Sequence, residues 1–297
     1  EPERQFQLEP MRFMAPPFGW PTNRPPPPPR GFPPKANSFS FSADLATYAQ
    51  GMGDGTVILK STVNDDATTL KVCDQMVDFV ALAPDARALI TGARFQALRW
   101  WDLRVGTNFV LETEAFRAVF SPDGRMFAAF PWGNTFEIWD ATTRAVRLKI
   151  TSDATPGAAA FSPDSRLLAA VCGDDSIRLW DTATGRLIGA CTGHKQGVHC
   201  VAFSPDGRTL ATASDDSTLK LWNVATQQEL LTIRRLGGTL HRLVFSPDGT
   251  LLAGGNFSAT TSGSLRFYPA PLGGETDEPT GNAAATSAGI RLNLPVR

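Results

Sequence analysis

Three histidines and four cysteines are the side chains with which this chain of 297 residues could carry out nucleophilic or metal chemistry. A serine or cysteine nucleophile needs a nearby base, usually histidine, and a zinc site needs clustered ligands. The cysteines are widely separated and lack Cys-x-x-Cys spacing: Cys73, Cys172, Cys191 and Cys200. We therefore expect reduced structural thiols, and we predict neither a metal site nor a cofactor.

Two of the histidines hold equivalent positions in similar segments. His199 and His241 each precede a phenylalanine by four residues, which indicates a repeated framework and not an acid–base pair. Recurring aspartates also fall at turn positions. The stretch 51–55 (Gly-Met-Gly-Asp-Gly) is similar to a phosphate loop, but no helix follows it, so we interpret it as a tight turn. The sequence predicts no catalytic residue.

An internal repeat accounts for these equivalent positions. Phe-Ser-Pro-Asp occurs four times at intervals of 41 or 42 residues, and two weaker copies start at Phe41 and Leu82. A repeat of this period indicates a repeat architecture. The four full copies start at Phe120, Phe161, Phe203 and Phe245.

A second anchor fixes the register of each unit. A tryptophan follows the first residue of the anchor by 19 positions in units two to five: Trp101, Trp139, Trp180 and Trp222. Lys60 takes this position in the first unit, and in the sixth a three-residue insertion predicts Phe267 as the equivalent. Apolar residues alternate before each tryptophan, as at Leu219 and Leu221, which predicts a strand with one buried face.

Each unit consists of predicted strands separated by polar turns. Ser-Pro-Asp-Gly suits a type I turn, because proline presets φ at the second position and glycine fits the fourth. No helical periodicity of useful length is present, so the chain is predicted to be all-β. A four-stranded unit of about 40 residues cannot bury its own apolar face, and radial stacking of the units solves that problem.

The repeat resembles the WD40-repeat β-propeller family from about Phe41 to Phe267. The best unit contains Gly-His at 193–194, Phe-Ser-Pro-Asp-Gly at 203–207 and Trp-Asn at 222–223. The resemblance implies a hydrogen-bonded structural network of His194, Thr212, Asp216 and Trp222. Other units depart from this pattern, with Phe95 and Gly133 at the aspartate position. We therefore expect a complete network in one blade and partial networks elsewhere.

The number of blades follows less directly from the repeat. Six units are recognisable, whereas members of this family most often have seven blades, so we expect six or seven four-stranded blades. Rings of this family usually close by pairing a strand from one terminus into the last blade. The candidate closing strands are residues 5–9, 11–14 and 290–295.

Composition divides the chain into three regions. Residues 1–36 hold twelve of the 23 prolines and form a Pro-rich extension or linker that could strap or close the ring. Residues 37–271 form the propeller, and residues 272–297 a low-complexity tail with a candidate closing strand. In the extension, Pro25, Pro28 and Arg30 fit the Pro-x-x-Pro-x-Arg pattern that SH3-type grooves accept. A stiff linker or strap is the alternative interpretation.

Charge and hydropathy exclude several classes of partner. The net charge of −1 gives no electrostatic reason to expect nucleic acid or an anionic membrane. No apolar stretch reaches the length of about 18 residues that a membrane span needs. No signal peptide opens the chain, so a cytoplasmic location is expected. A start at Glu1 without methionine suggests a processed product or a piece of a longer protein.

We expect a non-enzymatic platform that binds a protein or peptide within a larger assembly. The resemblance implies a binding face at the loops before the first strand and between the second and third. These loops carry Asp78, Arg94, Phe116, Trp132, His199, Asp215, His241 and Phe257. Phe116 and Trp132 form either an apolar anchor or part of the core. The alternatives are a sensor module of a bacterial kinase or signalling NTPase, and an enzyme that uses the central channel.

Overall fold

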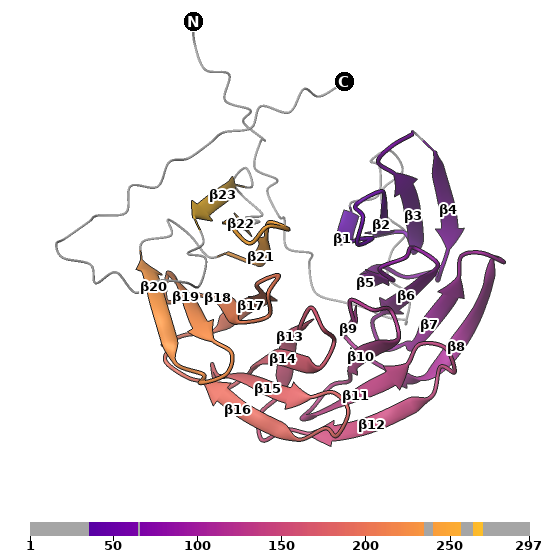
Figure 1. Ribbon diagram of the computed structural model, residues 1–297. Helices are drawn as coiled ribbons and strands as arrows, with labels where there is room; N and C mark the ends of the chain where they lie inside the picture. Colours follow the sequence, from indigo (N-terminus) through magenta and orange to yellow (C-terminus); the bar gives the residue numbers. More distant parts are fainter. Residues whose placement is uncertain (1–35, 65, 235–239, 257–263, 270–297) are drawn as a thin grey trace, which may run out of the picture.

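The computed structural model describes residues 36–64, 66–234, 240–256 and 264–269 (Figure 1). All regular structure in them is β, in six antiparallel sheets built from consecutive strands, which we call blades 1 to 6. Blade 1 comprises β1 (Ala36–Phe41), β2 (Thr47–Met52), β3 (Thr56–Ser61) and β4 (Ala67–Lys71). Blade 2 comprises β5 (Val77–Leu82), β6 (Ala88–Ala93), β7 (Ala97–Asp102) and β8 (Thr107–Glu114). Blade 3 comprises β9 (Arg117–Phe120), β10 (Met126–Phe130), β11 (Thr135–Asp140) and β12 (Val146–Thr151).

The remaining three blades follow the same order. Blade 4 comprises β13 (Pro156–Phe161), β14 (Leu167–Cys172), β15 (Ile177–Asp181) and β16 (Leu187–Cys191). Blade 5 comprises β17 (Val198–Phe203), β18 (Thr209–Ser214), β19 (Thr218–Asn223) and β20 (Glu229–Arg234). Three strands of blade 6 are described: β21 (Arg242–Phe245), β22 (Leu251–Asn256) and β23 (Ser264–Pro269).

The blades radiate from a common centre, as expected of a β-propeller. The first strands of successive blades pack on one another, from β1 through β5, β9, β13 and β17 to β21, and later strands lie further out (Figure 1). The prediction of an all-β propeller is confirmed, and the six recognisable repeats correspond to the six blades. The proposed closing strands and the Pro25–Pro28–Arg30 motif lie outside the described residues. No helix in the described part of the chain is long and apolar enough to cross a membrane.

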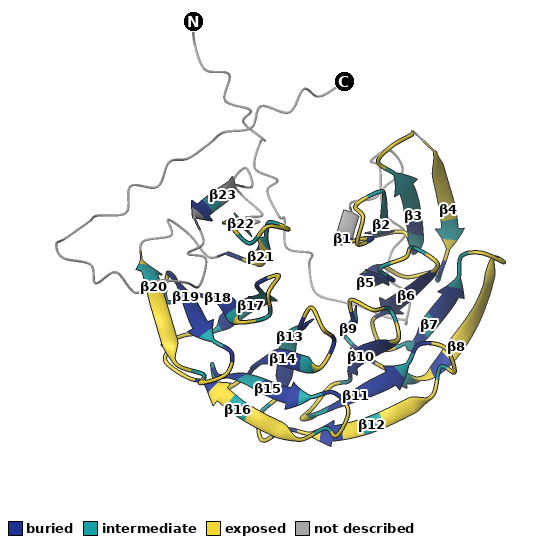
Figure 2. Cartoon of the chain, in the orientation of Figure 1, coloured by how far each residue is buried: buried dark blue, intermediate teal, exposed yellow. Residues whose placement is uncertain are grey.

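The apolar core lies between the blades and not within any one of them. Each of five clusters of buried side chains draws its members mainly from two consecutive blades. Phe127 of blade 3, for example, is fully buried between Trp139 of its own blade and Trp100 of blade 2, with ring centroids 5.6 and 5.7 Å away. Exposed residues concentrate on the outermost strands (Figure 2). Each blade is therefore buried by its neighbours.

The Phe-Ser-Pro-Asp anchor forms a hydrogen-bonded turn between the first two strands of a blade. In blade 5, the Ser204 hydroxyl donates to Asp206 Oδ1 (2.6 Å) and accepts from the backbone N–H of Thr209 (2.9 Å). The same Asp206 oxygen accepts from the N–H of Arg208 (3.0 Å). Equivalent hydroxyl–carboxylate bonds are made by Ser42, Ser121, Ser162 and Ser246. The motif recurs because it closes the same turn in each of these blades.

Blade 5 contains the four-residue network that the family resemblance implied. His194 Nδ1 lies 3.0 Å from Asp216 Oδ2, and His194 Nε2 lies 2.8 Å from Thr212 Oγ1. Thr212 Oγ1 also accepts from Trp222 Nε1–H at 2.8 Å. Burial lowers the pKa of His194, so its ring is neutral at pH 7.

The ionisation of Asp216 fixes the direction of the hydrogen bonds in this network. Burial alone would raise the pKa of Asp216, but hydrogen bonds from Thr218, from the backbone of Lys195 and from His194 hold it well below its usual range. An ionised carboxylate only accepts hydrogen bonds, so Nδ1 of the neutral histidine must carry the proton. Nε2 is then an acceptor, and the Thr212 hydroxyl donates to it.

The other blades contain only parts of this network. In blade 2, Trp101 Nε1–H donates to Thr91 Oγ1 (3.0 Å), and in blade 3 Trp139 Nε1–H donates to Glu137 (3.1 Å). In blade 4, Arg178 takes over the role of the histidine. Its guanidinium donates to Asp174 (2.7 Å), the counterpart of Asp216, and to Ser152 Oγ (3.0 Å).

The sixth blade corrects one sequence assignment. We expected Phe267 at the tryptophan position, but Leu252 pairs with Tyr268, as Leu210 pairs with Trp222 in blade 5. Tyr268 is accordingly buried, at 8 % exposure, whereas Phe267 alternates to the other face of the sheet and is half-buried. A register shift of one residue turns a strand side chain to the opposite face of the sheet. The pairing of β22 with β23, and not the residue type, therefore determines which aromatic residue is buried.

Replacement of the central hydroxyl measures the contribution of the network to stability. Thr212→Val leaves Trp222 Nε1–H and His194 Nε2 without a partner, and each buried unpaired group costs about 1–3 kcal/mol. Thr91→Val, the matched control in blade 2, leaves only Trp101 Nε1–H unpaired. We expect Thr212→Val to lower the free energy of unfolding by about twice as much, measured by urea denaturation. Equal losses would show that the histidine bond contributes nothing.

The anchor turn predicts a specific sensitivity to acid. A hydrogen bond from Ser204 holds the pKa of Asp206 in the folded protein below its ordinary value. The charged carboxylate therefore stabilises the folded state fully at any pH above the pKa that Asp206 has in the unfolded chain. We expect Asp206→Ala to be less stable than the wild type by about 1 kcal/mol at neutral pH. This difference should shrink as the pH falls through the folded pKa, below about pH 4.

The control for this measurement is Asp85→Ala in blade 2. There Ala83 replaces the serine of the anchor, so Asp85 accepts from the N–H of Arg87 but from no anchor hydroxyl. At neutral pH, Asp85→Ala should therefore lower the free energy of unfolding by less than Asp206→Ala does. A difference between wild type and Asp206→Ala that does not change with pH would contradict the role assigned to the carboxylate.

Candidate functional site

The residues of the predicted binding face lie where the innermost strands begin. In blades 2 and 5 the pairing of the first two strands shifts register, between Val77 and Phe79 and between Val198 and Cys200. The skipped residues are Asp78 and His199. A β-bulge leaves its extra residue outside the ladder and redirects its side chain. The same kind of β-bulge therefore sets the position of Asp78 at the start of β5 and of His199 at the start of β17.

Two aromatic rings in blade 3 form a contact on this face. The centroids of Phe116 and Trp132 lie 4.9 Å apart with an interplanar angle of 38°. Phe116 immediately precedes β9 and packs against the core between blades 3 and 4, whereas Trp132 follows β10 and is 66 % exposed. Trp132 is therefore a surface residue, whereas Phe116 is partly buried at the edge of the core.

A small pocket of about 190 Å³ adjoins the two rings. Four predicted face residues line it together, namely Asp78, Arg94, Phe116 and Trp132. Phe95 also lines it and is 75 % exposed, with a φ of 57° in the left-handed region. The sequence interpretation noted Phe95 only as a departure from the network aspartate. Phe95 is a large apolar residue at a turn position, and this could have predicted that it lies exposed on the same face.

A second cluster of predicted residues joins blades 5 and 6. His199 Nε2 lies 2.7 Å from Asp215 Oδ2, and the rings of His199 and His241 are 5.1 Å apart in an edge-to-face arrangement. The two histidines come together because they hold the same repeat position in neighbouring blades. Phe257, the remaining predicted face residue, lies outside the described part of the chain.

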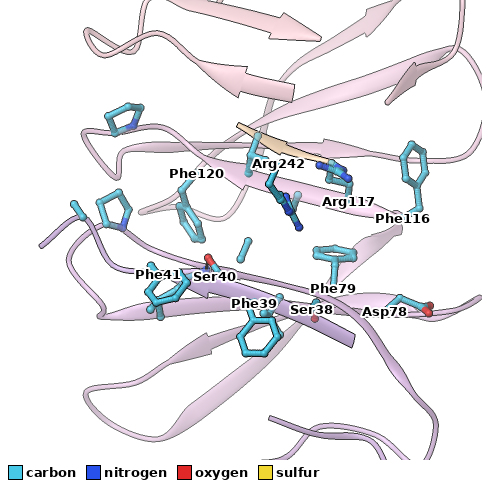
Figure 3. A pocket seen from close by; sticks show the side chains of 18 residues that line it. Ser38, Phe39, Ser40, Phe41, Asp78, Phe79, Phe116, Arg117, Phe120 and Arg242 are labelled. Carbon is cyan, nitrogen blue, oxygen red and sulfur yellow. Dashed lines mark hydrogen bonds between the residues drawn. The ribbon is translucent and has the colours of Figure 1, made fainter. Parts of the chain in front are cut away.

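A larger cavity of about 630 Å³ occupies the centre of the propeller, between β1, β5, β9 and β21 (Figure 3). It shares Asp78 and Phe116 with the small pocket, so the binding face continues into the centre of the ring. Arg117 and Arg242 also line it.

The thiols and imidazoles are placed for packing and for hydrogen bonding. Burial raises the pKa of Cys191 to about 11 and that of Cys200 to about 12, so neither is a thiolate at neutral pH. Within the described ranges, no serine, threonine or cysteine side chain is hydrogen-bonded to His199. Nor do three His, Cys, Asp or Glu side chains gather there closely enough to hold a metal ion. The arrangement offers binding chemistry, with aromatic, cationic and acidic groups on one face.

Comparison with known families identifies part of the chain. The family model described as "WD domain, G-beta repeat" matches residues 152–181 and 185–223. The first match covers β13–β15 of blade 4, and the second extends from β16 to the end of β19 in blade 5. A comparison with curated proteins found no significant match.

The exposure of Trp132 predicts that it contributes little to folding. We expect Trp132→Ala to change the free energy of unfolding by less than about 1 kcal/mol, as is usual for surface positions. Trp139→Ala, the matched substitution at a residue with 5 % exposure, should cost about 3–5 kcal/mol. Urea denaturation of both variants measures this. A large loss for Trp132→Ala would assign that ring to the core.

Proposed function

Because the chain is a six-bladed β-propeller that carries WD40 repeats, we propose that it is a non-enzymatic platform that binds a protein or peptide partner, within a larger assembly. One observation carries the proposal. Trp132 is exposed and is held in place by the half-buried ring of Phe116. Exposed aromatic side chains with a rigid support are typical anchors of protein interfaces, since burying them costs little conformational entropy.

The surroundings of the two rings indicate what kind of partner fits. The small pocket beside them is lined by the apolar ring of Phe95 and by three charged residues, Asp78, Arg94 and Glu114. An apolar centre within a polar rim is the usual anatomy of a protein interface. We therefore propose a partner that inserts an apolar side chain between Phe95 and Trp132 and forms hydrogen bonds with the rim.

The protonation of the candidate nucleophiles supports a binding role over catalysis. The buried thiols of Cys191 and Cys200 are neutral at pH 7, and His199 is oriented by Asp215 without a hydroxyl to activate. Three of the four cysteines are buried, and all four are unpaired in the described structure. Free buried thiols are typical of reducing compartments, which supports a cytoplasmic location as part of the proposal.

The proposal is tested by capture of the partner with matched apolar substitutions. Proteins that co-purify with the tagged wild-type chain are identified, and their affinity is measured against Trp132→Ala and Leu230→Ala. Leu230 is a control because it is 56 % exposed on the outermost strand β20, away from the face. We expect Trp132→Ala to weaken capture by about thirtyfold, the effect of losing a 2 kcal/mol anchor. Leu230→Ala should bind as the wild type does.

Three results would overturn this proposal. Unchanged capture by Trp132→Ala would place the interface elsewhere on the propeller. Equal weakening by both substitutions would show that partners adhere to exposed apolar residues without a defined site. Conversely, turnover of a substrate by the purified chain would replace the platform with an enzyme.

A further inference from the structure

Two arginines from distant parts of the sequence line the central cavity. Arg117 is the first residue of β9 and Arg242 the first of β21, and each lies three residues before the phenylalanine of its anchor. They therefore occupy the same level of the ring, in blades 3 and 6. Figure 3 shows their side chains next to each other in the cavity, with Phe79 and Phe120 nearby.

The charges of these arginines are not neutralised by the residues around them. Neither guanidinium forms an ion pair or hydrogen bond with another residue in the described part of the chain. Burial, and then the nearby charge of Arg242, lowers the pKa of Arg117 to about 10, so Arg117 remains cationic at neutral pH. Arginine side chains are not deprotonated in proteins, so Arg242 carries a charge as well. Cys200 of β17 holds the same repeat position in blade 5 and adds no charge, because burial raises its pKa to about 12.

The acidic side chain of the lining does not offset this charge. Asp78, the second residue of β5, lines the cavity but forms no ion pair with either arginine in the described structure. Ser38 occupies the register position of the arginines in blade 1. It is only 8 % exposed, and its hydroxyl has no hydrogen-bond partner. Arg117 is half-buried and Arg242 is exposed, so both guanidinium groups can reach a ligand in the cavity. The buried Ser38 hydroxyl beside them is a further polar group that a ligand could satisfy.

Aromatic rings form part of the remaining wall, among aliphatic and small polar residues. The five phenylalanines that line the cavity come from three neighbouring blades: Phe39, Phe41, Phe79, Phe116 and Phe120. The volume of about 630 Å³ is within the range of about 300–1,000 Å³ that small-molecule sites occupy. A single inorganic ion would fill only part of it, so the ligand must contain an organic part that contacts these rings.

We propose that the central cavity binds a phosphate monoester, with the phosphate between Arg117 and Arg242 and the organic group against the phenylalanines. The two guanidinium charges match the dianionic phosphate, and the planar guanidinium donates to two phosphate oxygens at once. The ester is either a free small molecule or a phosphorylated side chain. This site does not rest on the proposed partner platform, since the aromatic anchor Trp132 does not line the cavity.

Binding is measured with two probes, inorganic phosphate and phenyl phosphate, by isothermal titration calorimetry and by phosphorus-31 NMR. We expect saturable binding of both, with phenyl phosphate the tighter because its ring contacts the aromatic walls. Arg117→Gln and Arg242→Gln should each weaken phenyl phosphate by about tenfold to a hundredfold, the cost of losing a charge-assisted hydrogen bond. Arg242→Lys keeps the charge without the bidentate donor and should give an intermediate affinity.

Two controls separate this site from general charge effects and from the partner face. Arg186→Gln makes the same charge change at an exposed residue that does not line the cavity, and it should bind as the wild type does. Trp132→Ala should also retain phenyl phosphate affinity, so that failure of the platform and failure of this site are distinguishable. The glutamine variants should remain folded in thermal denaturation, since each removes a like-charge repulsion.

The source of the ester is distinguished by a short phosphoserine peptide. Tighter binding of the peptide than of phenyl phosphate would identify a phosphorylated protein segment as the ligand, and weaker binding a free small molecule. The proposal is overturned if the wild type binds neither probe saturably. It is also overturned if the double variant Arg117→Gln/Arg242→Gln binds phenyl phosphate as tightly as the wild type does.

Discussion

Each blade of this propeller is buried by its neighbours, and this mutual burial is the constraint on which the rest of the structure depends. A four-stranded sheet of about 40 residues has two faces and no core of its own. The apolar clusters accordingly join consecutive blades, as where Phe136 of blade 3 packs edge-to-face on Trp180 of blade 4 with centroids 5.0 Å apart. Apolar contacts between the blades thus account for most of the buried core.

Because packing between blades supplies the core, blades 2 and 3 can lack the aspartate of the polar network. Blade 5 keeps the full network from Trp222 to Asp216. In blade 4, Ser152 stands at the histidine position, and Arg178 connects it to Asp174. In blades 2 and 3 the aspartate position is occupied by Phe95 and Gly133, with Trp132 beside the latter. The exposed aromatic residues of the proposed partner face therefore lie where the network has been lost. The proposed partner face and the polar network therefore use the same turn in different blades.

Much of the fold, and part of the site, followed from the repeat alone. Equal spacing from the anchor assigns residues to one end of the ring, and this predicted that Phe116 lies near Trp132. The contacts of His199 with Asp215 and His241 follow from the same repeat positions but were not predicted. The sequence predicted the wrong residue at the tryptophan position of the sixth blade, because a three-residue insertion precedes that position. The pairing of Leu252 with Tyr268 assigns the position to Tyr268. Residues that depart from a pattern, such as Phe95, were read as losses and not as new functions.

The arginine pair in the cavity shows a further limit of linear patterns. Arg117 and Arg242 hold the same repeat position in blades 3 and 6, so the repeat assigns them to one level of the ring, but only the curvature of the ring brings their charges together. Once formed, their cavity shares Asp78 and Phe116 with the pocket of the partner face. Phe116 is therefore a wall of both the proposed ligand site and the proposed partner site, because the aromatic end of blade 3 lies between the rim and the centre of the ring.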